Sequence, residues 1–254
     1  MPNGHKYTVN GEEKPGVTSI LSILNKPGLP QWAANQAIEA IKSDSKLVYS
    51  DNGKYYHVYE KTLYMARKAF TLRRDDSANI GKNVHKWIEN HVKNKLEGKD
   101  QDEEYSEDMK PSIESFLSWE EKYQPEYLFS ERIIYSEQGD YCGTCDVGVK
   151  IDGKRIVLDF KTGKPEKEYN KKLRRYTGKK RAYSSVFIQD ALYDLAIEEE
   201  EGIRADQYGA LYLSTNGELL FALTDDTDAY RKAGQAIVET FKSLNVINQL
   251  NQFK

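Results

Sequence analysis

Two aspartates and a lysine stand on either side of a predicted β-hairpin turn. Asp146 precedes the dipeptide Asp152-Gly153, and Asp159 and Lys161 follow it. Asp-Gly between two apolar runs is a strong signal for a two-residue turn. With these two residues as the loop, Val149 lies opposite Ile156. The hydrophobic pattern supports this register, because a slip by one residue would move every side chain to the other face.

The same register places Asp146 opposite Asp159, with Cβ atoms about 4.5–5.5 Å apart. Lys161 shares their face because side chains alternate along a strand. Two neighbouring carboxylates destabilise a fold unless something compensates them, and a divalent cation prefers such oxygen ligands. Two carboxylates and an ammonium are what metal-assisted phosphodiester hydrolysis requires. A bare Asp-x-Lys is more often an exposed strand end with an internal salt bridge, but the paired Asp146 favours the metal site.

Hydrophobic periodicity predicts the helices and strands that hold these residues in place. We expect helices at residues 20–24, 31–42, 60–72, 78–96, 111–123, 189–201 and 226–250. We expect strands at 129–135, 143–151, 155–161, 208–214 and 219–223, with a loop or hairpin at 44–58. The predicted class is α/β (α+β): a short mixed β-sheet flanked by helices, with an N-terminal helical extension. We predict two regions, 1–76 helical and packed on the core, and 77–254 as the core.

Four short motifs in order resemble the PD-(D/E)XK nuclease superfamily, and within it the RecB-type exonuclease branch. They are Gly81 to His85, Tyr141 to Asp146 ahead of the hairpin turn, Ile156 to Gly163 with Asp159-Phe160-Lys161, and Gln189 to Tyr193. The resemblance spans residues 81–193, and residues 17–21 with the helix around Trp32 also resemble the N-terminal part of phage-encoded members. It implies a restriction-endonuclease-like core.

The resemblance also implies roles for single residues. His85, Asp146 and Asp159 would bind Mg²⁺ or Mn²⁺, with two ions expected, and the carbonyl of Phe160 would be a further ligand. Lys161 would position the attacking water. Three further residues are candidates for the catalytic site: Gln189, Tyr193 and Glu131. For Glu131, a place on the surface of a strand with no role in catalysis is nearly as good an explanation. Helical spacing, independently of the resemblance, places Glu89 one turn after His85, where its carboxylate would orient the imidazole.

Ten basic residues and only two acids lie between Lys161 and Arg181. Tyrosines are interleaved with them, and rings can stack on bases while cations follow phosphates. The predicted nucleic-acid contacts are Lys164, Lys171, Lys172, Arg174, Arg175, Tyr176, Lys179, Lys180 and Arg181. A solvated loop is the alternative. The position between the Asp-x-Lys strand and the 189–201 helix favours a nucleic-acid loop beside the site.

Composition sets wider limits. The 254 residues carry a net charge of −3, so the basic segment is a local feature. Cys142 and Cys145 are the only cysteines, too few for the four-cysteine cluster of iron–sulfur relatives, so we expect no such cluster. We also expect no membrane span and a cytoplasmic, intracellular protein, encoded by a phage if the N-terminal resemblance holds.

Three functions stay open at this stage. The first is a DNA exonuclease preferring single strands or ends, and the second is a structure-specific or nicking endonuclease on the same fold. The third is a non-catalytic DNA-binding recombination partner. DNA is the expected partner, and a recombination or replication protein is a further candidate partner. The sequence leaves the oligomeric state open.

Overall fold

The structure is a computed structural model that describes residues 6–24, 28–43, 48–49, 56–99, 104–163, 165–170, 175–214 and 216–251. Its contacts divide the chain into two compact units. Unit 1 comprises Met1–Leu24 and Asn83–Lys254, and unit 2 comprises Asn25–Lys82. The division expected at residue 76 stays a prediction.

A five-stranded mixed sheet is the centre of unit 1. Its strand order is β11-β10-β7-β6-β5, with β10 and β7 parallel and the other neighbours antiparallel. The predicted α+β class is therefore confirmed, a short mixed sheet flanked by helices with a helical N-terminal part. The strands are β5 (Glu126–Ser136), β6 (Tyr141–Ile151), β7 (Lys154–Lys161), β10 (Gln207–Leu213) and β11 (Leu219–Thr224).

The β6–β7 hairpin has the predicted register. Val149 pairs with Ile156, and Ile151 pairs with Lys154 across the turn. The two turn residues, Asp152 and Gly153, have φ of 50° and 77°. Positive φ at both positions is the geometry of the type I′ turn, whose twist matches that of the flanking strands.

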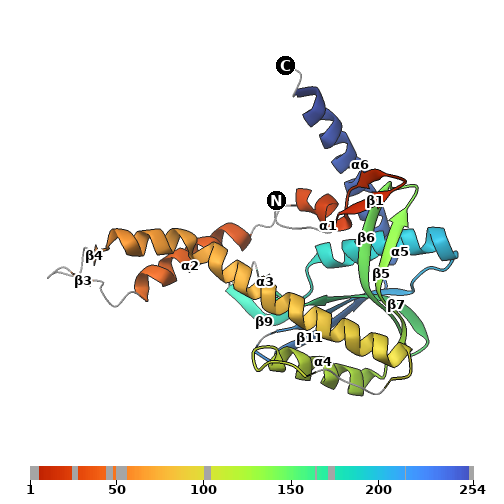
Figure 1. The fold of residues 1–254 in the computed structure, drawn as a ribbon, viewed down its shortest axis with the longest axis horizontal. Coiled ribbons are helices and arrows are strands. Elements are labelled where there is room, and N and C mark those ends of the chain that lie inside the picture. The colour runs from red at the N-terminus through yellow and green to blue at the C-terminus, as the bar shows by residue number, and fades with distance from the viewer. Residues whose placement is uncertain are drawn as a thin grey trace. The chain divides into compact units, whose positions relative to one another are not determined.

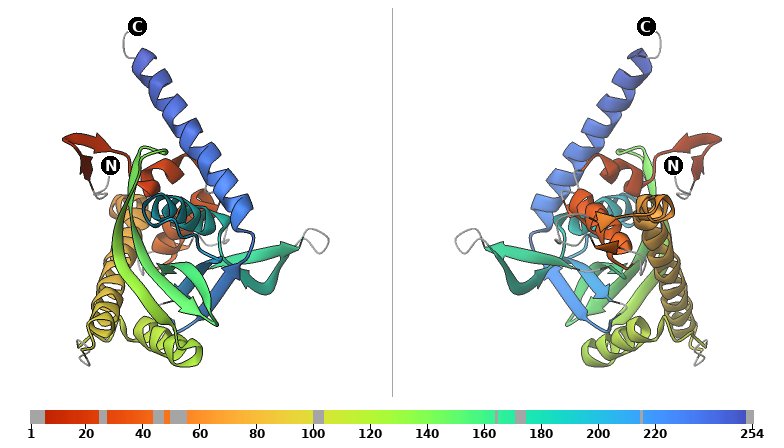
Figure 2. Two further views of the ribbon diagram at one scale, coloured as in Figure 1. Left: turned by 90° about the vertical axis from the view of Figure 1, so that its right-hand side faces the viewer. Right: turned by 90° about the vertical axis from the view of Figure 1, so that its left-hand side faces the viewer.

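Helices cover both faces of this sheet. α5 (Ser184–Glu201) and α6 (Thr227–Asn251) lie on one side, and α4 (Lys110–Tyr123) lies on the other (Figures 1 and 2). Side chains alternate along β7, so successive residues face opposite sides of the sheet, towards α5 or towards α4. Val157 belongs to the buried cluster of α5, whereas the Phe160 ring lies 5.9 Å from the Phe116 ring of α4.

One helix replaces two that the sequence predicted. α3 runs without interruption from Glu60 to Leu96, whereas we expected a break at residues 73–77. No proline or glycine occurs in that stretch, and the polar residues there do not stop a helix that neighbouring turns support. Residues 73–77 have no apolar stripe because this part of the helix is exposed to solvent.

Two hairpins were not predicted. β1 (Tyr7–Val9) and β2 (Glu12–Lys14) pair around Asn10-Gly11, which have φ of 52° and 84°. This Asn-Gly dipeptide is the same type of turn signal as Asp152-Gly153. The basic segment, expected as a loop, forms a second hairpin from β8 (Glu166–Asn170) and β9 (Arg175–Arg181).

The remaining elements are short or belong to unit 2. In unit 1 the chain forms α1 (Val17–Ile20) and a 3-10 helix, η1 (Leu21–Ile23). In unit 2 it forms α2 (Gly28–Lys42), β3 (Val48–Tyr49), β4 (Tyr56–His57) and the first part of α3. None of the helices in the described ranges is long and apolar enough to cross a membrane.

Gly153→Ala should lower the free energy of unfolding by about 1 kcal/mol, because an L-residue is strained at its φ of 77°. Urea denaturation of both proteins measures the difference. Gly163→Ala is the matched control, since a Cβ there meets nothing within 4 Å and its φ is not in the left-handed range. Equal destabilisation by the two substitutions would contradict the turn assignment.

Candidate active site

His85, Glu131 and Asp146 form a compact cluster of potential metal ligands. They come from α3, β5 and β6, which are separate along the chain. One ligand atom of each residue lies within 4.8 Å of the other two. An imidazole and two carboxylates are donors that suit a divalent cation such as Mn²⁺, and the carboxylates alone suit Mg²⁺.

An irregular stretch of β5 brings Glu131 into this cluster. The pairing of β5 with β6 shifts between Tyr127 and Phe129, which marks a bulge. Glu131 then lies between the pairs Ser130–Val147 and Arg132–Cys145, opposite Asp146, and its φ is 48°. A left-handed backbone is unusual for a long side chain, and such strain is concentrated at functional sites.

The backbone of β7 holds Asp146 and His85. The amide of Phe160 donates a hydrogen bond of 2.9 Å to Oδ2 of Asp146. Nδ1 of His85 lies 3.7 Å from the same oxygen, and the His85 ring meets the Phe160 ring edge-on with centroids 6.1 Å apart. Phe160, predicted as a ligand through its carbonyl, is therefore in contact with both side chains.

Asp159 and Lys161 form an ion pair beside this cluster. Nζ of Lys161 contacts Oδ2 of Asp159, which is 1% exposed. Oδ1 of Asp159 accepts a hydrogen bond of 2.8 Å from Nε2 of Gln189. The same amide nitrogen donates to the hydroxyl of Tyr193 at 2.9 Å, so the two residues of the Gln-x-x-x-Tyr motif lie on one face of α5.

Burial controls the charges at the site. It lowers the pKa of His85, which favours the neutral imidazole that a metal ligand must be. Burial, together with Asp146 and Glu89, raises the pKa of Glu131 to about 7. Burial also raises the pKa of Asp159, although Lys161 opposes the shift. Ionisation of these carboxyl groups is unfavourable here, and a cation bound nearby would stabilise their ionised forms.

The ammonium of Lys161 stays charged. Burial lowers the pKa of Lys161, but the carboxylates of Asp159 and Asp146 outweigh burial, and the net shift is upward. A fixed positive charge next to the carboxylates can attract a phosphate group and an incoming hydroxide.

The structure divides the predicted set of ligands into two neighbouring parts. His85 and Asp146 lie with Glu131, whereas Asp159 is outside the 4.8 Å group and bound by Lys161 and Gln189. The expectation for Glu89 was wrong. Its oxygens accept from Lys86 at 3.0 Å and Lys93 at 2.5 Å rather than orienting His85.

Asp190 is a buried carboxyl group that the sequence analysis missed. It is 0% exposed, and among the described residues neither of its oxygens has a hydrogen-bond partner. Burial raises the pKa of Asp190 well above its usual range, and Asp159 adds to the effect. An aspartate immediately after Gln189, among the apolar residues Phe187, Ile188, Ala191 and Leu192 of α5, was the available signal.

The structure shows only part of the predicted nucleic-acid contacts. Lys164, Lys171, Lys172 and Arg174 lie outside the described residues, and the side chains of Arg175, Tyr176 and Lys179 are not described. The remaining two are at the end of β9. Lys180 makes an ion pair of 2.6 Å with Glu218, and Arg181 pairs in the strand ladder with Glu166.

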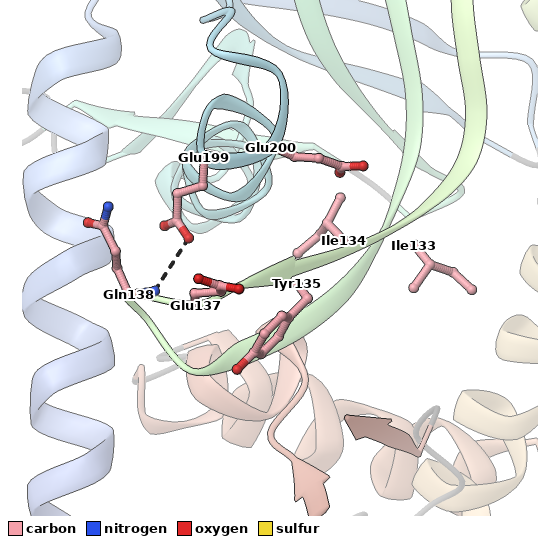
Figure 3. A pocket seen from close by; sticks show the side chains of 7 residues that line it. All are labelled: Ile133, Ile134, Tyr135, Glu137, Gln138, Glu199 and Glu200. Atoms are coloured by element: carbon pink, nitrogen blue, oxygen red, sulfur yellow. Dashed lines mark hydrogen bonds between the residues drawn. The ribbon is translucent and has the colours of Figure 1, made fainter. Parts of the chain in front are cut away.

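A separate cavity of about 570 Å³ lies between β5 with its following turn and the end of α5. Figure 3 shows Glu199 there, accepting a hydrogen bond from the backbone amide of Gln138. Ile133, Glu137 and Glu200 also line this cavity, which contains none of the candidate active-site residues.

No protein-family model matches the chain, and no curated protein matches it. Solved structures that are similar to it at low identity include the following two. A "putative exonuclease" from Eubacterium rectale is 15% identical with a TM-score of 0.43, covering 85% of this chain and 81% of that one. A protein named SSO0001 is 14% identical with a TM-score of 0.33, covering 85% of this chain and 86% of that one. At these scores the likeness assigns no function.

Glu131→Gln should change how stability depends on pH in protein without divalent ions. The pKa of Glu131 is raised from about 4.5 to about 7, so the folded state keeps a proton that the unfolded state has lost. The free energy of unfolding should therefore fall as pH rises from about 4.5 to about 7, by about 1–3 kcal/mol. Urea denaturation in EDTA at pH 5 and pH 8 measures this loss.

The variant should lose less stability over the same pH range, because glutamine does not ionise. Asp159 contributes to the wild type and the variant alike, so the difference between the two proteins isolates Glu131. Identical pH dependence in both would show that Glu131 ionises normally.

Proposed function

We propose that the chain is a divalent-metal-dependent nuclease that hydrolyses phosphodiester bonds of DNA. One observation carries this proposal: the cluster of His85, Glu131 and Asp146 adjoins the ion pair of Asp159 and Lys161. Together they combine ligands for a cation with a fixed positive charge, the two requirements of metal-assisted phosphoryl transfer.

The residues present fit a divalent ion. His85, Glu131 and Asp146 would hold it, with Asp159 as the neighbouring carboxylate. Oδ2 of Asp159 is buried and has no hydrogen-bond partner among the described residues, apart from its ion pair with Lys161. Bound Mg²⁺ or Mn²⁺ supplies Lewis-acid polarisation of a phosphoryl oxygen and a more acidic water.

The other residues of the site act on the substrate and its water. Lys161 holds a positive charge that attracts the scissile phosphate and orients the attacking hydroxide. Gln189 fixes Asp159 in place by its hydrogen bond of 2.8 Å. The Tyr193 hydroxyl accepts from Gln189, and because the described residues provide no acceptor for its own hydrogen, it would donate to a phosphate oxygen.

The tyrosine proton is also strongly held. Burial raises the pKa of Tyr193 well above its usual range. Tyr193 therefore serves as a hydrogen-bond donor over the whole physiological pH range.

Asp159→Asn and Lys161→Ala should each reduce metal-dependent cleavage of labelled DNA about a hundredfold or more, because each removes a charge at the reacting phosphate. Initial rates with Mg²⁺ or Mn²⁺, and with EDTA as a blank, give the measurement. Lys150→Ala is the matched control, since Lys150 is an exposed lysine of the same hairpin. Full activity in Asp159→Asn and Lys161→Ala would refute this assignment of the site.

We further propose that the enzyme acts from DNA ends, as an exonuclease that prefers single strands. The motif resemblance and the basic hairpin β8–β9 support this choice. End-labelled linear DNA should be degraded, and closed circular DNA of the same sequence should persist. Cutting of circles would instead support the structure-specific or nicking endonuclease. DNA binding by the wild type without any cleavage would favour the non-catalytic recombination partner.

A further inference from the structure

Unit 2 uses one face of α3 to pack against α2. The rings of Trp32 and Phe70 meet edge-to-face with centroids 5.0 Å apart. Gln36 of α2 accepts a hydrogen bond of 2.5 Å from Arg73. Ala66 and Ala69 are buried on the same side of α3. The packing of α2 against α3 therefore covers only this face of α3.

The opposite face of α3 carries exposed rings. Tyr64 lies two residues from Ala66, which places it about 200° away around the helix. Its side chain is 54% exposed, and Tyr59, just before the helix begins, is 56% exposed. At this exposure both rings are accessible to another molecule.

Positive charge surrounds these rings. Residues 61–74 contain five basic side chains and no acidic one. Within the described ranges no acid forms an ion pair with Lys61, Arg67 or Lys68. Further along the same helix the pattern reverses, because Lys93 and Lys95 pair with glutamates.

One contact combines the two features. Nζ of Lys68 lies 4.4 Å from the ring centroid of Tyr64, one helical turn away. A ring with a cation beside it can stack on a base while the cation meets the neighbouring phosphate. A double helix keeps its bases stacked on one another, so rings of this kind are useful for a single strand. Three of the five cations, Lys61, Arg67 and Lys68, belong to this face, because Arg73 bonds to Gln36 and Arg74 pairs with Asp75. Cations without acids among them suit a phosphate backbone.

We propose that the α3 face of unit 2 formed by Tyr59, Lys61, Tyr64, Arg67 and Lys68 binds single-stranded nucleic acid. The proposal deepens the nuclease function and rests on it for its biological purpose. The binding itself requires no catalysis and can be measured separately. It assigns to unit 2 a part in substrate capture that is distinct from the β8–β9 hairpin.

The experiment measures binding of a fluorescent thirty-nucleotide oligothymidylate to the full chain by anisotropy, in EDTA so that no cleavage occurs. Tyr64→Leu should raise Kd about tenfold, since stacking on one aromatic ring contributes about 1–3 kcal/mol. Tyr64→Phe keeps the ring and should bind like the wild type. Thermal unfolding of each variant confirms that the fold is intact.

Lys68→Ala tests the charge separately. It should weaken binding and reduce the slope of log Kd against log salt by about 0.7, the value for one phosphate contact on a single strand. Lys99→Ala is the matched control, because Lys99 is an exposed lysine that pairs with Glu97. It should leave both Kd and the slope unchanged.

Wild-type affinity and salt slope in both Tyr64→Leu and Lys68→Ala would overturn the inference. Equal binding of duplex and single strand, with the same sensitivity to Tyr64→Leu, would also overturn it. Hydrolysis of thymidine 5′-monophosphate p-nitrophenyl ester with Mn²⁺ tests the active site by itself. If the wild type hydrolyses neither this ester nor DNA, the nuclease proposal fails, and the binding result for unit 2 still stands.

Discussion

Pairing of β6 with β7 through the Asp152-Gly153 turn is the constraint on which the candidate site depends. The register directs Val149 and Ile156 towards one side of the sheet and places Asp146, Val157 and Asp159 on the other. Because the register is fixed, the amide of Phe160 reaches Asp146 at 2.9 Å. A slip of one residue would turn Asp159 away from Gln189 of α5 and towards the apolar side that Phe160 shares with Phe116. The stability of the core and the position of the site are therefore set by the same ladder.

Clustered carboxylates are costly to bury, and each one here is compensated differently. Asp146 accepts a backbone hydrogen bond, Asp159 has the ammonium of Lys161, and Glu131 holds a proton up to about pH 7. Asp190 has no partner among the described residues. Burial raises the pKa of Asp190 well above its usual range, which favours its protonated form, and a cation bound nearby would favour ionisation. The site is thus arranged to gain stability when positive charge arrives.

Local signals predicted the hairpin, the mixed sheet and the helical positions of His85 and Gln189, because turn chemistry and periodicity act over a few residues. Glu131 could not be placed in this way, since a bulge and a left-handed residue decide which way it faces. The continuity of α3 was also missed, because polar residues at 73–77 resemble a linker when no neighbouring turns are considered. Asn10-Gly11 was a readable signal that the sequence analysis passed over.

The left-handed backbone at Glu131 has an evolutionary consequence. Glycine would adopt its φ of 48° without strain, yet glycine has no carboxylate to offer the cluster. Selection for a more stable fold and selection for activity therefore favour different residues at this position. A lineage released from the need for the activity would drift toward glycine or asparagine here. The residue found at this position in a homologue would then report whether its ancestors kept the chemistry.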